Sequence, residues 1–266
     1  MGDFLRRLRT LPREAYRLSG SLGRLTNLER RVDRLEHALF RNVARFVACE
    51  QIEGDYMEFG VYRGATFAAN YHIFCEIFEA RIRQDNGGED LEENANHRQA
   101  IWDSMRFFAF DSFEGLPELT VEDAESTDFT AGQYACSVDQ FMQNMKRRSV
   151  PTERVIPVKG WFENSCNTQT LGEHGIHKAA VVFIDCDIYS ATKTVLEFVG
   201  PLLQDGSVLI FDDWFSYRGH PGRGEQRAFY EWSSSKEIAD RFHFTEYHKD
   251  SWKRNSFIVN SLDLQE

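Results

Sequence analysis

The fold of this chain is decided by two apolar runs that end in acidic residues, Val181-Val-Phe-Ile-Asp185-Cys-Asp187 and Ser207-Val-Leu-Ile-Phe-Asp212-Asp213. Continuous runs of this kind are typical of strands buried on both faces of a parallel sheet. The carboxyl ends of neighbouring parallel strands meet at one edge of the sheet, where open α/β folds bind ligands. A bound cation would balance the like charges gathered there, and oxygen ligands favour a hard ion such as Mg²⁺.

Length and composition set the limits of the architecture. The chain has 266 residues, of which 42% are hydrophobic, enough for one sizeable α/β core without disulfides. Its five cysteines are scattered and form no C-x-x-C pair, so the pattern indicates neither a disulfide framework nor a zinc site and favours the reducing cytoplasm. No apolar run has the length of a membrane span, and the start lacks the apolar core of a secretory signal. We therefore expect a soluble, cytoplasmic protein without a transmembrane segment.

Charge is distributed unevenly along the chain. The formal net charge is −11, yet the first 45 residues carry 11 arginines against five acids. An acidic body argues against nucleic acid as the main partner, because phosphate binding needs a basic face. The basic arm is either a contact for an anionic membrane or polymer, or simply a solvated surface.

The arm also carries an apolar stripe. Leu25, Leu28, Val32, Leu35 and Leu39 recur at steps of three and four, which places them on one side of a helix. The functional interpretation is a short coiled coil that makes a homo-oligomer, and the alternative is a helix that packs on its own domain. We divide the chain into a helical arm, 1–45, and an α/β domain, 46–266.

Beyond the arm, short apolar runs alternate with helical stretches, which is typical of repeated βα units. We expect parallel strands at 55–60, 105–111, 154–158, 180–185 and 207–212. Two further strands, at 243–248 and 256–259, have no convincing helix between them and are expected to form an antiparallel pair at the sheet edge.

Two polar connections interrupt this pattern. Residues 84–98 are rich in acids and turn formers and are expected to be a mobile surface insertion. Residues 114–133 form a second long connection with few helix signals, and loops of this length often cover a binding site.

The first strand runs into Glu58-Phe-Gly60-Val-Tyr-Arg-Gly64-Ala-Thr66, an acid followed by two glycines. Glycines permit a tight turn and a close approach of the backbone to a ligand, next to the free amides of a helix start. The third glycine of the dinucleotide fingerprint is missing, which favours a nucleoside without a pyrophosphate over NAD. The alternative is a turn whose glycines serve packing only.

The next two strand ends carry further candidates. Asp111 and Ser112 follow the second strand, and an acid at this position commonly accepts hydrogen bonds from ribose hydroxyls. The alternative for Asp111 is the cap of a turn. Trp161 and Phe162 follow the third strand, where a flat aromatic side chain can stack on adenine, unless the pair belongs to the core.

These segments together resemble the macrocin O-methyltransferase family, S-adenosylmethionine-dependent enzymes that methylate hydroxyl groups, notably on sugars of natural products. The matching segments occur in family order: Glu58-Phe-Gly-Val-Tyr-Arg-Gly64, Asp111-Ser-Phe-Glu-Gly-Leu-Pro117, Lys159-Gly-Trp-Phe162, Asp185-Cys-Asp-Ile-Tyr189-Ser-Ala-Thr192 and Phe211-Asp-Asp213. The resemblance implies a Rossmann-like class I methyltransferase fold, with a mostly parallel seven-stranded sheet, and a sugar or glycosylated metabolite as the small-molecule acceptor. Family members often have glycine where Cys186 stands.

The resemblance also implies roles for individual residues. Asp185, Asp212 and Asp213 would hold Mg²⁺ or another divalent cation. The cofactor-binding residues would be Glu58, Phe59, Gly60, Gly64, Thr66, Asp111, Ser112, Trp161, Phe162 and Asp185.

The group that takes the proton from the acceptor is less defined by sequence. Asp187 lies two residues beyond Asp185, so it would point to the same face if the strand conformation continued. It is a candidate for base, metal ligand or outer partner, and we favour the base. His220, in a glycine-rich loop, is the second catalytic candidate, with plain surface as its alternative.

Two other functions remain open at this point. The acidic strand ends also match the motifs of haloacid dehalogenase-like phosphatases, but Tyr189 stands where those enzymes usually have Thr or Val, and only one βα unit separates the two motifs. A non-catalytic interaction module on a methyltransferase scaffold would not need the acids, all of which are present.

Overall fold

The computed structural model describes residues 37–86, 92–117, 132 and 134–263. The chain divides into two units, Met1–Ala38 and Leu39–Glu266, and the account that follows concerns the second. The predicted coiled-coil stripe from Leu25 to Leu35 and most of the predicted covering loop, 118–131 and 133, lie outside the described residues.

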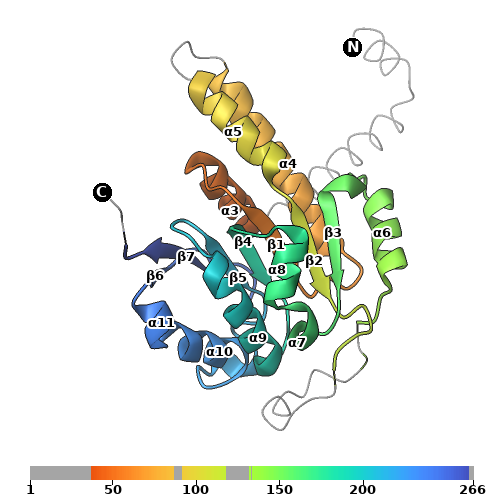
Figure 1. The fold of residues 1–266 in the computed structure, drawn as a ribbon, viewed down its shortest axis with the longest axis vertical. Helices are drawn as coiled ribbons and strands as arrows, with labels where there is room; N and C mark the ends of the chain where they lie inside the picture. The colour runs from red at the N-terminus through yellow and green to blue at the C-terminus, as the bar shows by residue number, and fades with distance from the viewer. Residues whose placement is uncertain (1–36, 87–91, 118–131, 133, 264–266) are drawn as a thin grey trace, which may run out of the picture. The chain divides into compact units, whose positions relative to one another are not determined.

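A seven-stranded sheet organises the second unit, with strand order β3-β2-β1-β4-β5-β7-β6 (Figure 1). β1 to β5 are parallel, and β7 pairs antiparallel with both β5 and β6. This confirms the predicted fold class, the five parallel strands and the antiparallel terminal pair. The strands are β1 Asp55–Phe59, β2 Phe107–Asp111, β3 Val155–Lys159, β4 Ala179–Ile184, β5 Val208–Phe211, β6 Phe242–Glu246 and β7 Asn255–Ser261.

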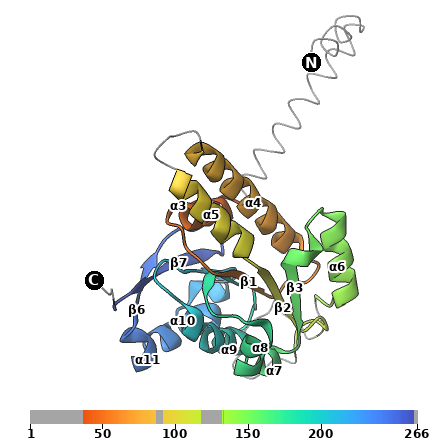
Figure 2. The same cartoon turned by 45° about the horizontal axis from the view of Figure 1, so that its top comes forward.

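Helices cover both faces of the sheet (Figures 1 and 2). One core joins α3, α4, α5 and α6 to alternate side chains of the strands, such as Tyr56 and Phe183. The other joins α9, α10 and α11 to the intervening side chains, such as Met57 and Ile184. The helices are α3 Ala38–Cys49, α4 Ala65–Asp85, α5 Glu92–Ser104, α6 Val138–Arg147, α7 Phe162–Ser165, α8 Thr168–His174, α9 Tyr189–Val199, α10 Gly224–Ser233 and α11 Lys236–Ala239, with 3-10 turns at Thr152–Arg154, Gly200–Leu202 and Tyr217–Gly219.

α3 begins inside the predicted arm and belongs to the core. Its apolar face, including Phe40, Val43 and Val47, is fully buried. The amide of Leu39 donates to Asp250 Oδ2 over 3.1 Å, which ties the start of the helix to the segment before β7. The compact unit therefore starts at Leu39.

The polar stretch at 84–98 is not the predicted mobile insertion over its described part. α4 continues to Asp85 and α5 starts at Glu92, and the two helices lie side by side in both views (Figures 1 and 2). Arg98 is buried, forms an ion pair with Asp85 and donates from Nε to the carbonyl of Ala48 over 2.7 Å. A buried ion pair that also binds the end of α3 orders a segment whose composition alone favours disorder.

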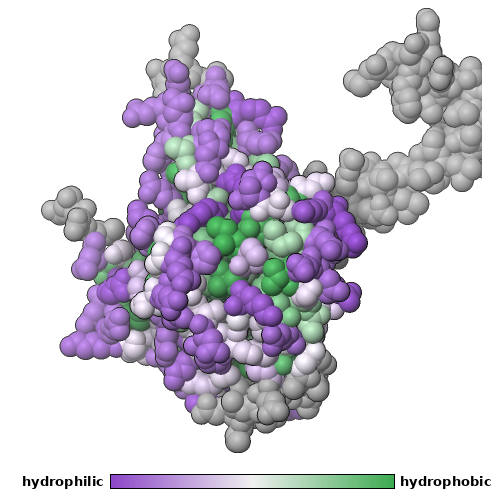
Figure 3. Space-filling view, turned by 45° about the vertical axis from the view of Figure 1, so that its right-hand side comes forward, coloured by the Kyte–Doolittle hydropathy of each residue, from purple (hydrophilic) through white to green (hydrophobic). Residues whose placement is uncertain are grey.

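One face of the molecule combines apolar and polar residues. Figure 3 shows one face on which apolar residues gather near the centre and hydrophilic residues surround them. None of the described helices combines the length and the apolar character needed to cross a membrane.

Candidate functional site

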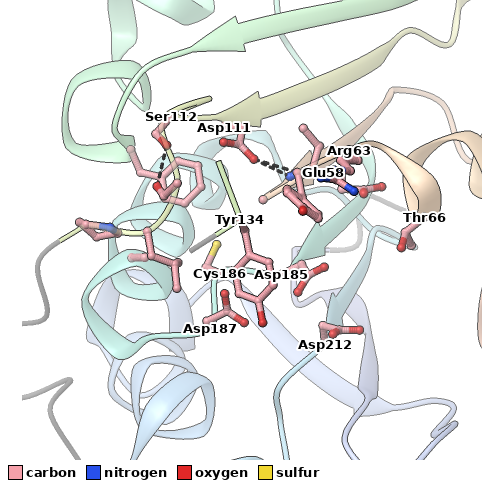
Figure 4. Close-up of a pocket in the computed structure, with 18 of the residues that line it drawn as sticks. Glu58, Arg63, Thr66, Asp111, Ser112, Tyr134, Asp185, Cys186, Asp187 and Asp212 are labelled. Atoms are coloured by element: carbon pink, nitrogen blue, oxygen red, sulfur yellow. Dashed lines mark hydrogen bonds between the residues drawn. The ribbon is translucent and has the colours of Figure 1, made fainter. Parts of the chain in front are cut away.

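A cavity of about 440 Å³ lies at the carboxyl ends of β1, β2, β4 and β5 (Figure 4). Parallel strands run in the same direction, so their carboxyl ends lie at one edge of the sheet and the residues that follow them meet there. Most of the predicted site residues line the cavity: Glu58, Gly60, Thr66, Asp111, Ser112, Trp161, Phe162, Asp185, Asp187 and Asp212.

Four predicted site residues do not line the cavity. Phe59 is fully buried and stacks on Phe110, with 4.6 Å between the ring centroids. Gly64 caps the start of α4. Asp213 is buried, with 3% of its surface exposed. His220 is exposed, and its Nδ1 accepts a hydrogen bond from the amide of Gly222 over 3.0 Å.

The glycines after β1 are required by neighbouring protein atoms. Gly60 has φ +89°, and a Cβ there would overlap the carbonyl oxygen of Asp185. Gly64 has φ +73°, and a Cβ there would press on Phe141 and Met145 of α6. Both positions therefore meet the packing requirement that was the alternative interpretation. The turn that they permit lines the cavity with the segment from Gly60 to Arg63.

Asp111 holds this turn in place. Its Oδ2 accepts hydrogen bonds from the amides of Val61 and Tyr62 over 2.8 and 3.0 Å, and its Oδ1 accepts one from the amide of Phe113 over 2.7 Å. The residue acts as the cap that was its alternative interpretation. It also lines the cavity. Its Oδ2 already accepts two hydrogen bonds, whereas its Oδ1 accepts only one from the backbone and has a second lone pair that a ribose hydroxyl can use.

Glu58 is a buried acid at the end of β1, with 1% of its surface exposed. Its Oε2 accepts a hydrogen bond from the hydroxyl of Tyr56 over 2.5 Å, and Asn70 in turn donates to that hydroxyl over 2.6 Å. Burial raises the pKa of Glu58 from 4.5 to about 8, because a charged carboxylate loses its hydration there.

Two aromatic side chains follow β3 at the cavity wall. Phe162 packs edge-on against Phe59, with 5.9 Å between the ring centroids, so it belongs partly to the core. Trp161 is half-buried and lines the cavity. The structure therefore makes Trp161 the better stacking surface of the pair.

Carboxylates crowd the opposite end of the cavity. Asp185, Asp187 and Asp213 each bring a carboxylate oxygen within 4.8 Å of the others. Figure 4 shows Asp185 and Asp187 close to the ring of Tyr134, on the side of the view away from Asp111. We call these three residues the acid cluster.

The path of the chain explains why Asp187 belongs to the acid cluster. β4 ends at Ile184, and Asp187 has φ +64°. The predicted continuation of the strand is therefore absent, and a left-handed residue turns the chain instead. Aspartate tolerates this conformation better than most residues, although it carries a strain cost of about 1 kcal/mol or more.

Asp212 has different partners from the acid cluster. Arg254 donates to its Oδ1 and Lys253 contacts its Oδ2. Burial alone would raise the pKa of Asp212, but the charges of Arg254 and Lys253 outweigh burial and hold it below its usual value. Sequence reasoning missed both cations, which stand directly before β7.

The acid cluster is electrostatically strained. Burial raises the pKa of Asp185, and the neighbouring Asp212 and Asp187 raise it further. Burial and the nearby Asp213 likewise raise the pKa of Asp187. Like charges held together in a low dielectric favour protonation unless a cation accompanies them.

Glu225 is a further acid that sequence reasoning missed. It lies in the first turn of α10, with 1% of its surface exposed, and its Oε2 accepts a hydrogen bond from the amide of Asp213 over 2.9 Å. Burial and the charge of Asp213 raise its pKa. The only sequence signal was an acid in the first helical turn after a glycine-rich loop.

The donor set fits a hard divalent cation. Asp213 Oδ2 and Glu225 Oε1 are buried and have no hydrogen-bond partner among the described residues. Buried carboxylate oxygens without partners are costly. Mg²⁺ is bound in proteins by carboxylate oxygens together with water, and the acid cluster offers such oxygens.

The family is given by comparison with known proteins. The model of the family described as Macrocin-O-methyltransferase (TylF) matches residues 87–249, which is more than half of the chain. The chain belongs to the macrocin O-methyltransferase family. This membership leaves the phosphatase interpretation without support and confirms the resemblance seen in the strand-end motifs.

Two curated relatives of this macrocin O-methyltransferase family member are O-methyltransferases by their names, and the first name includes a rhamnosyl group. One is 8-demethyl-8-(2,3-dimethoxy-alpha-L-rhamnosyl)-tetracenomycin-C 4'-O-methyltransferase from Streptomyces olivaceus, 25% identical over 70% of this chain and 60% of its own length. The other is mycinamicin III 3''-O-methyltransferase from Micromonospora griseorubida, 27% identical over 61% of this chain and 56% of its own length. The chain thus matches less than two thirds of each relative.

Solved structures support the fold of this family member. CalS11, a calicheamicin methyltransferase, aligns with a TM-score of 0.60 and 18% identity over 97% of this chain and 90% of its own. The O-methyltransferase NovP aligns with a TM-score of 0.56 and 21% identity over 86% of this chain and 80% of its own.

Proposed function

We propose that this chain is a metal-dependent O-methyltransferase that transfers the methyl group of S-adenosylmethionine to a hydroxyl group of a sugar or glycosylated metabolite. One observation carries the proposal. In a member of the macrocin O-methyltransferase family, a single cavity joins a glycine turn suited to a nucleoside with a cluster of carboxylates suited to a cation. The sugar acceptor is favoured by the rhamnosyl group in the name of the first curated relative.

The half of the cavity formed by β1, β2 and β3 would hold the cofactor. S-adenosylmethionine would supply an electrophilic methyl group for in-line transfer to the acceptor oxygen, with the neutral thioether as the leaving group. Asp111 would accept from the ribose hydroxyls while its amide contacts keep the turn after β1 in shape. Trp161 would stack on the adenine, and Glu58 would lie on the methionine side of the nucleoside.

The acid-lined half of the cavity would hold the cation and the acceptor. A divalent cation supplies Lewis-acid chemistry, in which the pKa of a bound hydroxyl falls. Asp185 and Asp213 would hold the cation, with Asp212 as the third predicted ligand. Asp187 lines the cavity and would take the acceptor proton at a carboxylate oxygen.

His220 stays a prediction as a second catalytic residue. Its exposed side chain and its contact with Gly222 leave Asp187 as the nearer candidate for the base. Replacing His220 with Gln would separate the two: a rate equal to that of the wild type would remove His220 from the mechanism.

The decisive experiment combines cofactor binding with methyl transfer. Calorimetry would measure binding of S-adenosylhomocysteine by the full chain. Radiolabel from methyl-labelled S-adenosylmethionine would then be followed into rhamnosylated polyketides with free sugar hydroxyls, with Mg²⁺ or with EDTA. We expect label in the sugar only with Mg²⁺ present. Absence of cofactor binding would refute the methyltransferase, and equal labelling in EDTA would refute the metal dependence.

We extend the proposal to the cellular setting. All five cysteines are free thiols, in keeping with a reducing cytoplasm. The proposed homo-oligomer would form through the arm, whose stripe lies outside the described residues except for Leu39. Light scattering of the full chain and of a variant without residues 1–36 would test this contact. An unchanged oligomeric state in the variant would exclude the arm as the contact.

A further inference from the structure

Lys253 brings a positive charge into the acid-lined half of the cavity. Its Nζ lies 3.0 Å from Asp213 Oδ1 and also contacts Asp212 Oδ2. The side chain lines the cavity and is 27% exposed. The ammonium therefore occupies a position between two of the three carboxylates that were predicted to hold a cation.

Its contacts leave the two carboxylates in different states. Asp212 is bonded on both oxygens, by Arg254 and by Lys253. Asp213 is bonded on Oδ1 by Lys253 and by the hydroxyl of Ser216, which donates over 2.8 Å. Its Oδ2 is buried and has no hydrogen-bond partner among the described residues. Asp213 therefore has hydrogen bonds on Oδ1, one of them from the ammonium of Lys253, but none on its buried Oδ2 among the described residues.

More carboxylates than cations lie around the site. The two cations that contact these acids are Lys253 and Arg254. They face a larger group of buried or half-buried carboxylates: Asp185, Asp187, Asp212, Asp213 and Glu225. A divalent ion that enters this group would compete with the ammonium of Lys253 for the same carboxylate oxygens.

The two internal cations differ in their ability to leave. The Nε atom of Arg254 contacts Asp212, and its Nη1 atom lies 3.8 Å from Asp250 Oδ1. These two contacts hold the planar guanidinium in place. Lys253 is a point charge on a flexible stem, at a partly exposed position next to the cavity. Lys253 is therefore the cation that a metal ion can displace.

We propose that Lys253 is a resident counter-ion that competes with the divalent cation for Asp212 and Asp213 and so lowers the affinity of the site for metal. In the metal-free protein the ammonium keeps the two carboxylates in place. When an ion binds, Asp212 Oδ2 and Asp213 Oδ1 become available to it and the ammonium moves into the cavity. This inference rests on the metal site of the proposed function but not on the methyl-transfer reaction.

The test measures Mn²⁺ binding by electron paramagnetic resonance at constant ionic strength. The variant is Lys253→Met, which keeps the length of the side chain and removes its charge. The matched control is Lys249→Met, because Lys249 belongs to the same segment, pairs with Glu246 over 2.8 Å and packs on Phe215. The control reports how much the loss of one nearby charge changes affinity without loss of the contact.

We expect Lys253→Met to bind Mn²⁺ at least tenfold more tightly than the wild type, and Lys249→Met to stay within about twofold. Equal affinities of Lys253→Met and the wild type would overturn the competition. Weaker binding by Lys253→Met would overturn it as well, because Lys253 would then be arranging the acids for the ion.

A second variant guards against loss of the fold. Lys253→Gln keeps a hydrogen-bond donor for Asp212 without the charge, and its Mn²⁺ affinity is expected to rise in the same direction. In thermal melts, saturating Mn²⁺ should raise the Tm of either variant more than that of the wild type, and equal shifts would overturn the inference.

The outcomes also separate this inference from the proposed function. Absence of Mn²⁺ binding by every variant would overturn the competition and the metal dependence together. Tighter binding by Lys253→Met in a protein that transfers no methyl group would uphold the competition and overturn only the enzymatic proposal.

Discussion

At the ends of β1 and β2 the acids are bonded within the chain, whereas at the ends of β4 and β5 they crowd one another. Glu58 accepts from the hydroxyl of Tyr56, and Asp111 accepts from three backbone amides. In contrast, Asp185 and Asp187 lie together with Asp213, whose Oδ2 has no hydrogen-bond partner among the described residues. Both halves belong to one cavity.

The first half of the cavity is therefore prearranged, whereas the acids of the second half lack some of their partners. Hydrogen bonds from neutral donors hold the first half in shape without any ligand, so it is ready for a cofactor. The second half gathers carboxylates that outnumber the two cations in contact with them, an arrangement that fits the cation of the proposed function. The four predictions that follow test this contrast.

The largest effect is expected from Asp187→Asn, which removes the proposed proton acceptor and keeps the shape of the side chain. Turnover should fall by roughly 10²- to 10⁴-fold, the usual contribution of a general base, while Mn²⁺ affinity changes much less. Steady-state methyl transfer and Mn²⁺ titration measure the two quantities. The exposed Asp240→Asn serves as the control, and wild-type turnover in Asp187→Asn would assign the proton to another group.

The next effect concerns the pH dependence of stability at Glu58. Its pKa is raised from 4.5 to about 8 in the folded chain. The stability contributed by the protonated group is therefore present below about pH 4.5 and is lost as the pH rises through about 8. Glu58→Gln has no such loss. Its free energy of unfolding, relative to that of the wild type, should rise by about 3 kcal/mol between pH 5 and pH 7.5.

Urea unfolding at a series of pH values measures this difference. The exposed Glu237→Gln is the matched control. A constant difference between Glu58→Gln and the wild type across this range would mean that Glu58 is charged in the folded protein, and the contrast between the two halves would disappear.

Metal binding should stabilise the protein through the acid-lined half alone. With Mg²⁺ at about 100 times its dissociation constant, the free energy of unfolding should rise by about 2.7 kcal/mol. Asp213→Asn should lose this gain and keep the stabilisation produced by S-adenosylhomocysteine. Thermal melts with each ligand decide the point, and a loss of both effects in Asp213→Asn would show that the halves are not independent.

The smallest effect is expected from Trp161→Ala on cofactor binding. A stacked aromatic contributes roughly 1–3 kcal/mol per base, and because Trp161 is half-buried at the wall we expect the lower part of this range, a loss of about tenfold in affinity for S-adenosylhomocysteine. Calorimetry measures the change. Trp252→Ala is the control, since Trp252 is 73% exposed and lies outside the cavity lining. Unchanged affinity in Trp161→Ala would place the adenine elsewhere.

Much of the sheet was predictable because its signal is local. A strand buried on both faces must be apolar throughout, and β4 shows this, with every residue from Ala179 to Ile184 buried. The acids after β1, β2, β4 and β5 stood out because charged residues are rare next to such runs. The polar helix α5 was missed because its order depends on Arg98 and Asp85, a pair whose burial no composition reveals.

Asp187 shows a correct expectation reached by an incomplete argument. Alternation along a strand predicted that it would lie beside Asp185. The strand has ended by then, and a left-handed turn at Asp187 brings the two carboxylates together. The spacing of Asp185 and Asp187 is visible in the sequence, but the left-handed turn at Asp187 depends on contacts with the rest of the fold.

The sequence alone determined the sheet, its carboxyl edge and the acids collected there, because the periodicity of apolar residues and the direction of parallel strands are local properties. Tertiary structure alone decided which acids are paired and which are not. Lys253, Arg254 and Glu225 reach the site from segments distant along the chain from Asp185. Electrostatic balance depends on distance in space and on burial, and neither quantity is written in the order of the residues.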